Sequence, residues 1–321
     1  MTNFSKVSTS HTGAEILEDG EIFNPTKIPV YDPEWTIRTY LIIYSFVFVI
    51  CIFGFVGNGI VIWFLGFCMK RNAFTIYILN LAVADFGVFI SVVLRCLIQF
   101  YLPAPLLVFY TFEYLFTIMF CTSQFLLTVI SIDRCVSVFF PLWHRCHRPP
   151  HLSITVCALI WLLNSLFCGI QILSKVWELF DFDLPLFQFF MNAVLCFPLL
   201  TVSTLTLLLK VCCKPKQHKR GKLLTVILVT LLVFLIVAFP FNVVVLHNYL
   251  SASLSVSLFY YGFFCASLNS GINPLIYFLV GKKKKGRVRE NIKAIFQRVF
   301  KEDEEFKEEP VHGQSGSETI M

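Results

Sequence analysis

Seven separate stretches of this chain are apolar over a length that crosses a lipid bilayer, and no other feature of the sequence restricts the fold as strongly. A transmembrane helix needs about 20 mostly apolar residues. The stretches are 39–67, 74–98, 106–138, 151–173, 184–211, 222–249 and 256–280. Short connections separate them, as in a compact helical bundle. The sequence therefore predicts an all-α membrane protein, a bundle of seven transmembrane helices.

The composition excludes the main soluble classes. Hydrophobic residues make up 57% of the chain and charged residues only 14%, whereas an average soluble domain is about 25% charged. So few polar side chains cannot cover a surface that faces water. No enzyme motif is present, and we expect no enzymatic activity. The net charge of +6 does not indicate nucleic-acid binding, because the basic residues gather beside the apolar stretches.

The distribution of basic residues predicts the orientation. With the N-terminus outside, the outer side holds only Lys6, Lys27, Arg38, Arg95 and Lys175, and the other Lys and Arg lie inside. Cytoplasmic loops of membrane proteins are enriched in Lys and Arg. We therefore expect a multi-pass plasma-membrane protein with an extracellular N-terminus and a cytoplasmic C-terminus. The sequon at Asn3 then lies outside and is a glycosylation site.

The same pattern divides the chain into four segments. Residues 1–38 form an extracellular tail, and 39–280 form the transmembrane domain. In 281–300, apolar residues recur at helical spacing among basic ones, which predicts a short amphipathic helix on the membrane lipids. Residues 301–321 are acidic and then rich in Gly and Ser, which predicts a disordered cytoplasmic tail.

Few ionisable residues lie within the apolar stretches, and such residues are functional candidates because charge is costly in a membrane. Asp85 lies midway along the second stretch, and Asp133 and Arg134 end the third. Arg95 and Glu113 lie toward the outer ends of the second and third stretches.

An ordered set of motifs resembles the rhodopsin-like G-protein-coupled receptors. The set comprises Gly57-Asn58, Leu81-Ala82-Val83-Ala84-Asp85, Asp133-Arg134-Cys135, Trp161, Pro198, Phe234, Pro240 and Asn273-Pro274-Leu275-Ile276-Tyr277. Its prolines remove helix hydrogen bonds and predict kinks. Residues 139–149, 77–81 and 277–281 are similar to the Mas-related receptors in particular. The resemblance implies a receptor that activates heterotrimeric G proteins, Gq or Gi, with arrestin as a further partner.

Asp133 and Arg134 suit an activation switch. The carboxylate can hold the neighbouring guanidinium in a resting state, and a released Arg134 can extend to meet a G protein. The resemblance adds Asn273, Pro274 and Tyr277 to this switch. The alternative is a solvated charge pair at a helix end.

A polar cluster is expected in the middle of the bundle. Asp85, Ser123, Asn269, Ser270 and Asn273 would converge there and offer a carboxylate with several further oxygen ligands. The resemblance implies an allosteric sodium ion at this point, and we expect no other cofactor or metal. The alternative is a hydrated cluster without a specific ion.

Arg95 and Glu113 are candidates for the ligand cavity. The outer segments are acidic, and such a field favours a cationic ligand. The expected ligand is a peptide or a small molecule resembling an amine or amino acid. The alternative for this pair is a structural ion pair.

Some residues depart from the rhodopsin-like pattern. Ala238 replaces the Trp that usually precedes the proline of the sixth span, and Arg220 replaces the acidic partner of Arg134. Phe109 replaces the Cys that usually staples the outer loop, so we expect this loop to have no disulfide. Most of the cysteines stand within apolar stretches, where Cys acts as a small hydrophobic residue, and we expect them to be reduced. Two other classes stay open: a seven-span channel or transporter, and a decoy receptor that binds ligand without signalling.

Overall fold

A computed structural model describes residues 33–101, 106–177, 191–213, 226–237 and 256–281, together with 294, 295 and 299. The predicted extracellular tail, its sequon at Asn3, the cytoplasmic tail and most of the predicted amphipathic helix lie outside these residues. The described part is helical and contains no strand.

The helices follow the predicted apolar stretches closely. They are α1 (Pro33–Trp63), α2 (Ala73–Tyr101), α3 (Leu106–Phe139), α4 (Pro141–Cys146), α5 (Leu152–Trp177), α7 (Phe197–Cys213) and α9 (Val256–Gly281). Residues Val226–Val237, within the predicted sixth span, are also helical. Wider π-helical turns, η2 (Phe64–Cys68) and η3 (Met191–Cys196), extend α1 and precede α7. These elements confirm an all-α class.

Length and composition show which helices can cross a membrane. Within the described residues, four helical segments meet both conditions: Ile42–Cys68, Ala73–Arg95, Tyr114–Phe139 and Leu152–Ser174. Val194–Lys210 and Val226–Val237 are shorter apolar helices. Helix α9 is 26 residues long and contains Pro274.

Local sequence explains where two of the helices begin. Asn72 caps α2, because its Oδ1 accepts hydrogen bonds from the backbone N–H groups of Phe74 at 3.1 Å and Thr75 at 2.8 Å. These N–H groups have no partner within the helix. Pro141 stands at the start of α4, where its missing N–H is not needed. The short helix α4 was not expected from the sequence.

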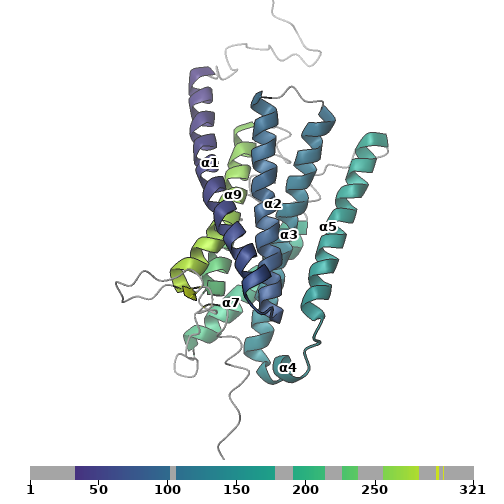
Figure 1. Ribbon diagram of the computed structural model, residues 1–321, viewed down its shortest axis with the longest axis vertical. Helices are drawn as coiled ribbons and strands as arrows, with labels where there is room; N and C mark the ends of the chain where they lie inside the picture. The colour runs from purple at the N-terminus through teal and green to yellow at the C-terminus, as the bar shows by residue number, and fades with distance from the viewer. Residues whose placement is uncertain are drawn as a thin grey trace, which may run out of the picture. The chain divides into compact units, whose positions relative to one another are not determined.

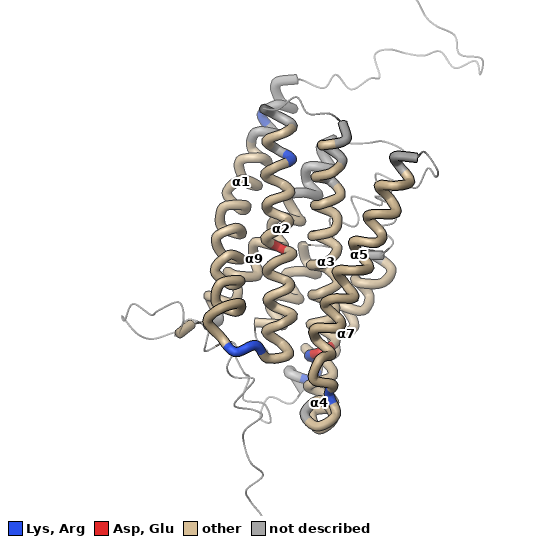
Figure 2. The backbone as a smooth tube through the Cα atoms, turned by 45° about the vertical axis from the view of Figure 1, so that its right-hand side comes forward, with Lys and Arg blue, Asp and Glu red and all other residues tan. Residues whose placement is uncertain are grey.

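Helices α2 and α3 form the centre of the packed bundle (Figure 1). They contact each other along most of their length, α3 also packs against α5 and α7, and α2 packs against α5 and α9. Charged residues are sparse along the described helices and gather toward the end that carries α4 (Figure 2).

The pattern of burial is that of a protein surrounded by lipid. Phe53 is 72% exposed, Leu162 63% and Ile236 71%, and in water so much exposed apolar surface would cause aggregation. Polar side chains are buried instead, with Asp85, Ser123 and Ser131 at 0% exposure. Such inward-facing polar groups in membrane helices mark functional sites.

Candidate functional site

The middle of the bundle holds a carboxylate bound by two neighbouring helices. Asp85 of α2 accepts a hydrogen bond from Ser123 Oγ of α3 at 2.7 Å on Oδ1. On Oδ2 it accepts one from Asn273 Nδ2 of α9 at 2.8 Å. The structure therefore brings together three of the five residues that the sequence predicts for a sodium pocket.

The other two predicted residues, Asn269 and Ser270, are also buried on α9. Asn269 Nδ2 has no hydrogen-bond partner among the described residues, and neither has Asn58 Oδ1. Each carboxylate oxygen of Asp85 also keeps lone-pair capacity beyond the bond described above. Carboxylate and amide oxygens around a buried negative charge fit a small hard cation, and they fit ordered water as well.

Asn58 explains how α9 tolerates a proline in its interior. Pro274 has no N–H, so the carbonyl oxygen of Ser270, four residues earlier, loses its helical partner. Asn58 Nδ2 of α1 donates to this oxygen at 3.2 Å and to Gly54 O at 3.0 Å. A side chain of a neighbouring helix thus satisfies the freed backbone group, as a membrane interior requires. Gly57 lies against the proline, because a Cβ there would approach Pro274 Cβ to 2.9 Å.

A second polar site lies at the end of α3 that carries α4. Arg134 Nη2 donates to Asp133 Oδ2 at 2.6 Å and Arg134 Nε to the same oxygen at 3.2 Å. The guanidinium carbon of Arg134 also lies 4.4 Å from the centre of the Phe74 ring, a cation–π geometry. Arg134 is only 5% exposed. The structure therefore places Arg134 folded against its neighbour and against α2.

Asp133 has further basic partners that the sequence did not indicate. Arg148 Nη2 lies 2.8 Å from Asp133 Oδ1, and His144 Nε2 lies 3.6 Å from the same oxygen. Arg148 also donates to Ser153 Oγ of α5 at 2.8 Å and lies 3.0 Å from His144 Nε2. One carboxylate thus connects α3, α4 and the start of α5. The abundance of basic residues in 140–148 was visible in the sequence, but their partner was not.

An apolar layer separates the two polar sites. A narrow void of about 10 Å³ is bordered by Leu81 of α2, Ile130 of α3 and Tyr277 of α9, among others. Each of these residues lies between the Asp85 level and the Asp133 level of the bundle. Tyr277 is 2% exposed.

Arg95 and Glu113 lie at the same level of neighbouring helices. Asp85 and Ser123 are hydrogen-bonded, and α2 and α3 run in opposite directions. Arg95 is ten residues beyond Asp85 and Glu113 ten residues before Ser123, or about 15 Å along each axis. The Arg95 side chain is buried, whereas the side chain of Glu113 lies outside the described residues.

The described cysteines are consistent with a reduced protein. Cys51, Cys68, Cys121, Cys135, Cys146, Cys157, Cys168, Cys196 and Cys265 are free. The redox state of the cysteines remains an expectation from the sequence.

The helices and their buried polar groups define a multi-span helical membrane protein. Comparison with known proteins identifies its class, because residues 57–277 match the family described as 7 transmembrane receptor (rhodopsin family). The rat protein Proto-oncogene Mas (Rattus norvegicus) is 35% identical, with 100% of this chain and 98% of that protein covered.

Two further relatives belong to the same branch. The mouse Mas-related G-protein coupled receptor member A1 (Mus musculus) is 38% identical over 80% of this chain and 89% of that protein. Mas-related G-protein coupled receptor member X2 from Hoolock hoolock is 35% identical over 88% of each. The chain therefore belongs to the Mas-related branch of the rhodopsin family of seven-transmembrane receptors. It is a multi-pass plasma-membrane receptor and not an enzyme.

Proposed function

We propose that this receptor binds an extracellular ligand and then promotes nucleotide exchange on a heterotrimeric G protein of the Gq or Gi class. The observation that supports this most directly is the ion pair between Arg134 and Asp133, with Arg134 packed over Phe74. A buried guanidinium is costly unless it is paired. Arg134 is therefore a group that can be held in one state and presented in another.

The proposed mechanism is a shift between two packings of the bundle. In the resting packing, Asp133 and Phe74 hold Arg134, and the layer around Tyr277 is closed. A ligand that binds the other packing better favours separation of the helices at this layer. The proline in α9 and Pro198 in α7 allow helix halves to move as rigid bodies. Arg134 then extends from α3 toward the G protein.

Sodium is the proposed allosteric ion of the middle site. Asp85 is hydrogen-bonded only by neutral donors among the described residues, Ser123 and Asn273. A buried carboxylate without a cationic partner favours an ion or protonation. Asn269 and Ser270 would supply further oxygen ligands. An ion there stabilises the resting packing.

The proposed ligand cavity includes Arg95 and Glu113, in the predicted extracellular third of the bundle. An arginine there can bind a carboxylate, and a glutamate can bind an amine. A peptide or a zwitterion resembling an amino acid has both groups. With the N-terminus outside, the acidic outer segments attract such a ligand through its positive charge.

The domain map follows from the same orientation. Residues 1–38 are the proposed extracellular tail, with a glycan at Asn3, and 39–280 the transmembrane domain. Residues 281–300 are the proposed amphipathic helix on cytoplasmic lipids, and 301–321 the cytoplasmic tail, where arrestin is a further proposed partner.

The test of G-protein coupling is the variant Arg134→Ala. Membranes that contain the full-length receptor are mixed with purified G protein, and ligand-independent binding of a non-hydrolysable GTP analogue is measured. We expect exchange to fall to the level of receptor-free membranes, because the variant loses the guanidinium fork at this site. Arg71→Ala is the matched control. Arg71 is exposed and donates to Gly66 O at 3.1 Å, so its removal should leave exchange unchanged.

The same assay separates this proposal from its alternatives. Full exchange by Arg134→Ala, at normal surface expression, would contradict the role of Arg134. A decoy receptor would give no exchange even as the unmodified protein. A channel or transporter would give ion or solute flux in proteoliposomes without any effect of guanine nucleotide.

A further inference from the structure

Two arginines bind Asp133, and they contact different oxygens of its carboxylate. Arg134 donates to Oδ2 through both Nε and Nη2, whereas Arg148 contacts Oδ1, through Nη2 at 2.8 Å. No more than 9% of each of the three side chains is exposed. A carboxylate this deeply buried needs at least one cationic partner, because an unpaired buried charge is strongly destabilising. The release of Arg134, which the proposed function requires, therefore depends on what remains beside Asp133.

His144 supplies no positive charge to Asp133 in this structure. Its Nε2 lies 3.0 Å from Nη1 of Arg148, and a guanidinium can only donate hydrogen bonds. Nε2 of His144 is therefore an acceptor without a proton, and the ring is neutral. The distance of 3.6 Å from this nitrogen to Asp133 Oδ1 is also too long for a hydrogen bond. Among the described residues that contact Asp133, Arg148 is thus the cation that remains when Arg134 leaves.

Arg148 is held in place by groups that do not belong to α3. Its Nη2 also donates to Ser153 Oγ of α5 at 2.8 Å, and Ser153 is only 1% exposed. The backbone of Arg148 lies between the end of α4 and the start of α5. A change of the Arg134 side chain therefore leaves the guanidinium of Arg148 beside Asp133.

The guanidinium of Arg148 has an unused donor. Its Nε is buried and makes no hydrogen bond to another described residue. Nε and Nη2 of an arginine point in the same direction and can bind the two oxygens of one carboxylate in parallel. In this structure Arg134 occupies Oδ2 of Asp133. When Arg134 leaves, Oδ2 loses its donor, and Nε of Arg148 is the group that can replace it.

We propose that Arg148 is a positioning residue for the switch, and that it replaces Arg134 as the partner of Asp133. The single contact from Nη2 to Oδ1 becomes a pair of hydrogen bonds, with Nε bound to Oδ2. Arg134 can then leave without an unpaired negative charge remaining in the interior. The inference rests on the proposed function, because it describes how that switch opens. It predicts that loss of Arg148 holds Arg134 more firmly in the resting packing, whereas loss of a simple lock would release it.

The first test measures ligand-independent exchange by the full-length receptor, with the GTP analogue described above. We expect Arg148→Gln to lower exchange about ten-fold, because the released state loses hydrogen bonds to a charged group. In the Asp133→Asn background no carboxylate needs a partner, so Arg148→Gln should have no further effect. If Arg148 only held α4 in place, its loss would lower exchange equally in both backgrounds. Arg71→Gln is the matched control, because it removes the same charge from the exposed α1–α2 connection.

The second test needs no G protein. Arg134→Gln imitates the departure of Arg134, so Asp133 then depends on Arg148. In this background, Arg148→Gln should lower the melting temperature of the purified receptor in nanodiscs by about 5 °C more than it does in the unmodified receptor. Most of this extra loss should disappear when Asp133→Asn is added. Repulsion between the two arginines would instead give an extra loss that persists without the carboxylate.

The two tests separate this inference from the function on which it rests. If the unmodified receptor gives no exchange, the proposed function fails, and the melting temperatures alone decide whether Arg148 replaces Arg134. The inference is overturned if Arg148→Gln raises exchange or leaves it unchanged, if Arg71→Gln lowers exchange equally, or if the extra loss of stability does not depend on Asp133. All variants are compared at equal surface expression. Ser153→Ala, which removes one support of Arg148, replaces Arg148→Gln if that variant does not fold, and it should lower exchange by a smaller factor.

Discussion

At the scale of single residues, two aspartates with different surroundings have different proposed uses. Asp133 is bound by Arg134 and Arg148, so its negative charge is neutralised in place. Asp85 is bound by Ser123 and Asn273, which are neutral. A carboxylate paired with an arginine can keep that arginine in one conformation, whereas a buried carboxylate without a basic partner attracts a cation.

Sodium should stabilise the purified receptor through Asp85. An ion that binds only the folded state raises stability by about 1.4 kcal/mol at ten times its Kd. We expect a higher melting temperature in sodium chloride than in choline chloride at equal ionic strength, and no difference for Asp85→Asn, which removes the charge. Ser91→Ala is the control, since Ser91 is buried on the same helix and, within the described part of the chain, its hydroxyl donates only to Gly87 O, at 2.7 Å. A sodium effect that persists in Asp85→Asn would place the ion elsewhere.

Neutral variants of Arg95 and Glu113 should weaken the response to a ligand. A peptide and amino-acid library with a calcium readout supplies the agonist, and dose–response curves follow for Arg95→Gln and Glu113→Gln. We expect potency to fall about ten-fold or more, because a charge-assisted hydrogen bond contributes about 1.5–3 kcal/mol. Lys70→Gln, on the α1–α2 connection, is the control. Unchanged potency at normal expression would remove both residues from the cavity, and reduced expression alone would indicate a structural ion pair.

The contacts of Asp85 with Ser123 and Asn273 were predictable, because their helices and motifs are visible in the sequence. The contacts of Asp133 with His144 and Arg148 were not. They depend on the path of the backbone through α4 and the turn that follows it. Hydropathy shows which segments are apolar, but it does not predict the backbone path of a polar loop between two of them.

At the scale of helices, hydropathy predicts bounds well but not the type of turn. The predicted stretch 106–138 corresponds to α3 at Leu106–Phe139. The π-helical turn η3 was missed, yet Pro198 offers a reason for it. The proline ring clashes with the carbonyl four residues earlier, at Val194 within η3, and a wider turn relieves such a clash.

Close packing of α1 on α2 depends on Gly54. A Cβ at this position would lie 2.1 Å from Cζ of Phe89, whose side chain is fully buried. Gly54→Ala should therefore destabilise the receptor by about 1–3 kcal/mol, the usual cost of overpacking. Gly169 has open space around its Cβ position, and Gly169→Ala should be neutral or stabilise by up to about 1 kcal/mol. Thermal unfolding of both variants in nanodiscs tests the pair, and equal melting temperatures would contradict the packing argument.

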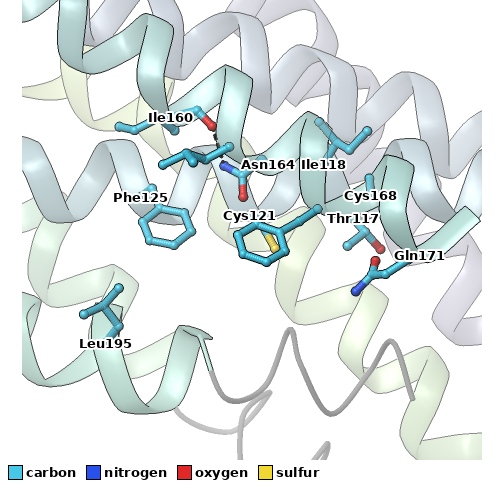
Figure 3. A pocket seen from close by; sticks show the side chains of 11 residues that line it. Thr117, Ile118, Cys121, Phe125, Ile160, Asn164, Cys168, Gln171 and Leu195 are labelled. Atoms are coloured by element: carbon cyan, nitrogen blue, oxygen red, sulfur yellow. Dashed lines mark hydrogen bonds between the residues drawn. The ribbon is translucent and has the colours of Figure 1, made fainter. Parts of the chain in front are cut away.

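At the scale of the whole molecule, many apolar side chains of the described helices face outward, while the buried interior contains polar side chains as well as an apolar core. Sequence composition predicts the outward-facing apolar surface, since so few charged residues cannot form a surface in water. The cavity between α3, α5 and η3 (Figure 3) was not predictable in the same way. Asn164 and Gln171 stand in an apolar stretch without any motif, and only the packing of α3, α5 and η3 shows that they share a cavity.

The orientation of the chain can be tested by glycosylation, which occurs only on the extracytoplasmic side. Because the basic residues gather on one side, the positive-inside rule predicts that Asn3 carries a glycan. Treatment with a glycosidase should increase the mobility of the unmodified receptor on a gel and leave Asn3→Gln unchanged. Val7→Asn, which creates a sequon with Thr9, should restore the glycan in the Asn3→Gln background. Gly313→Asn, which creates one with Ser315, should not. A glycan at position 313 would place the C-terminus outside, and the cluster of basic residues near it would then face the wrong side of the membrane.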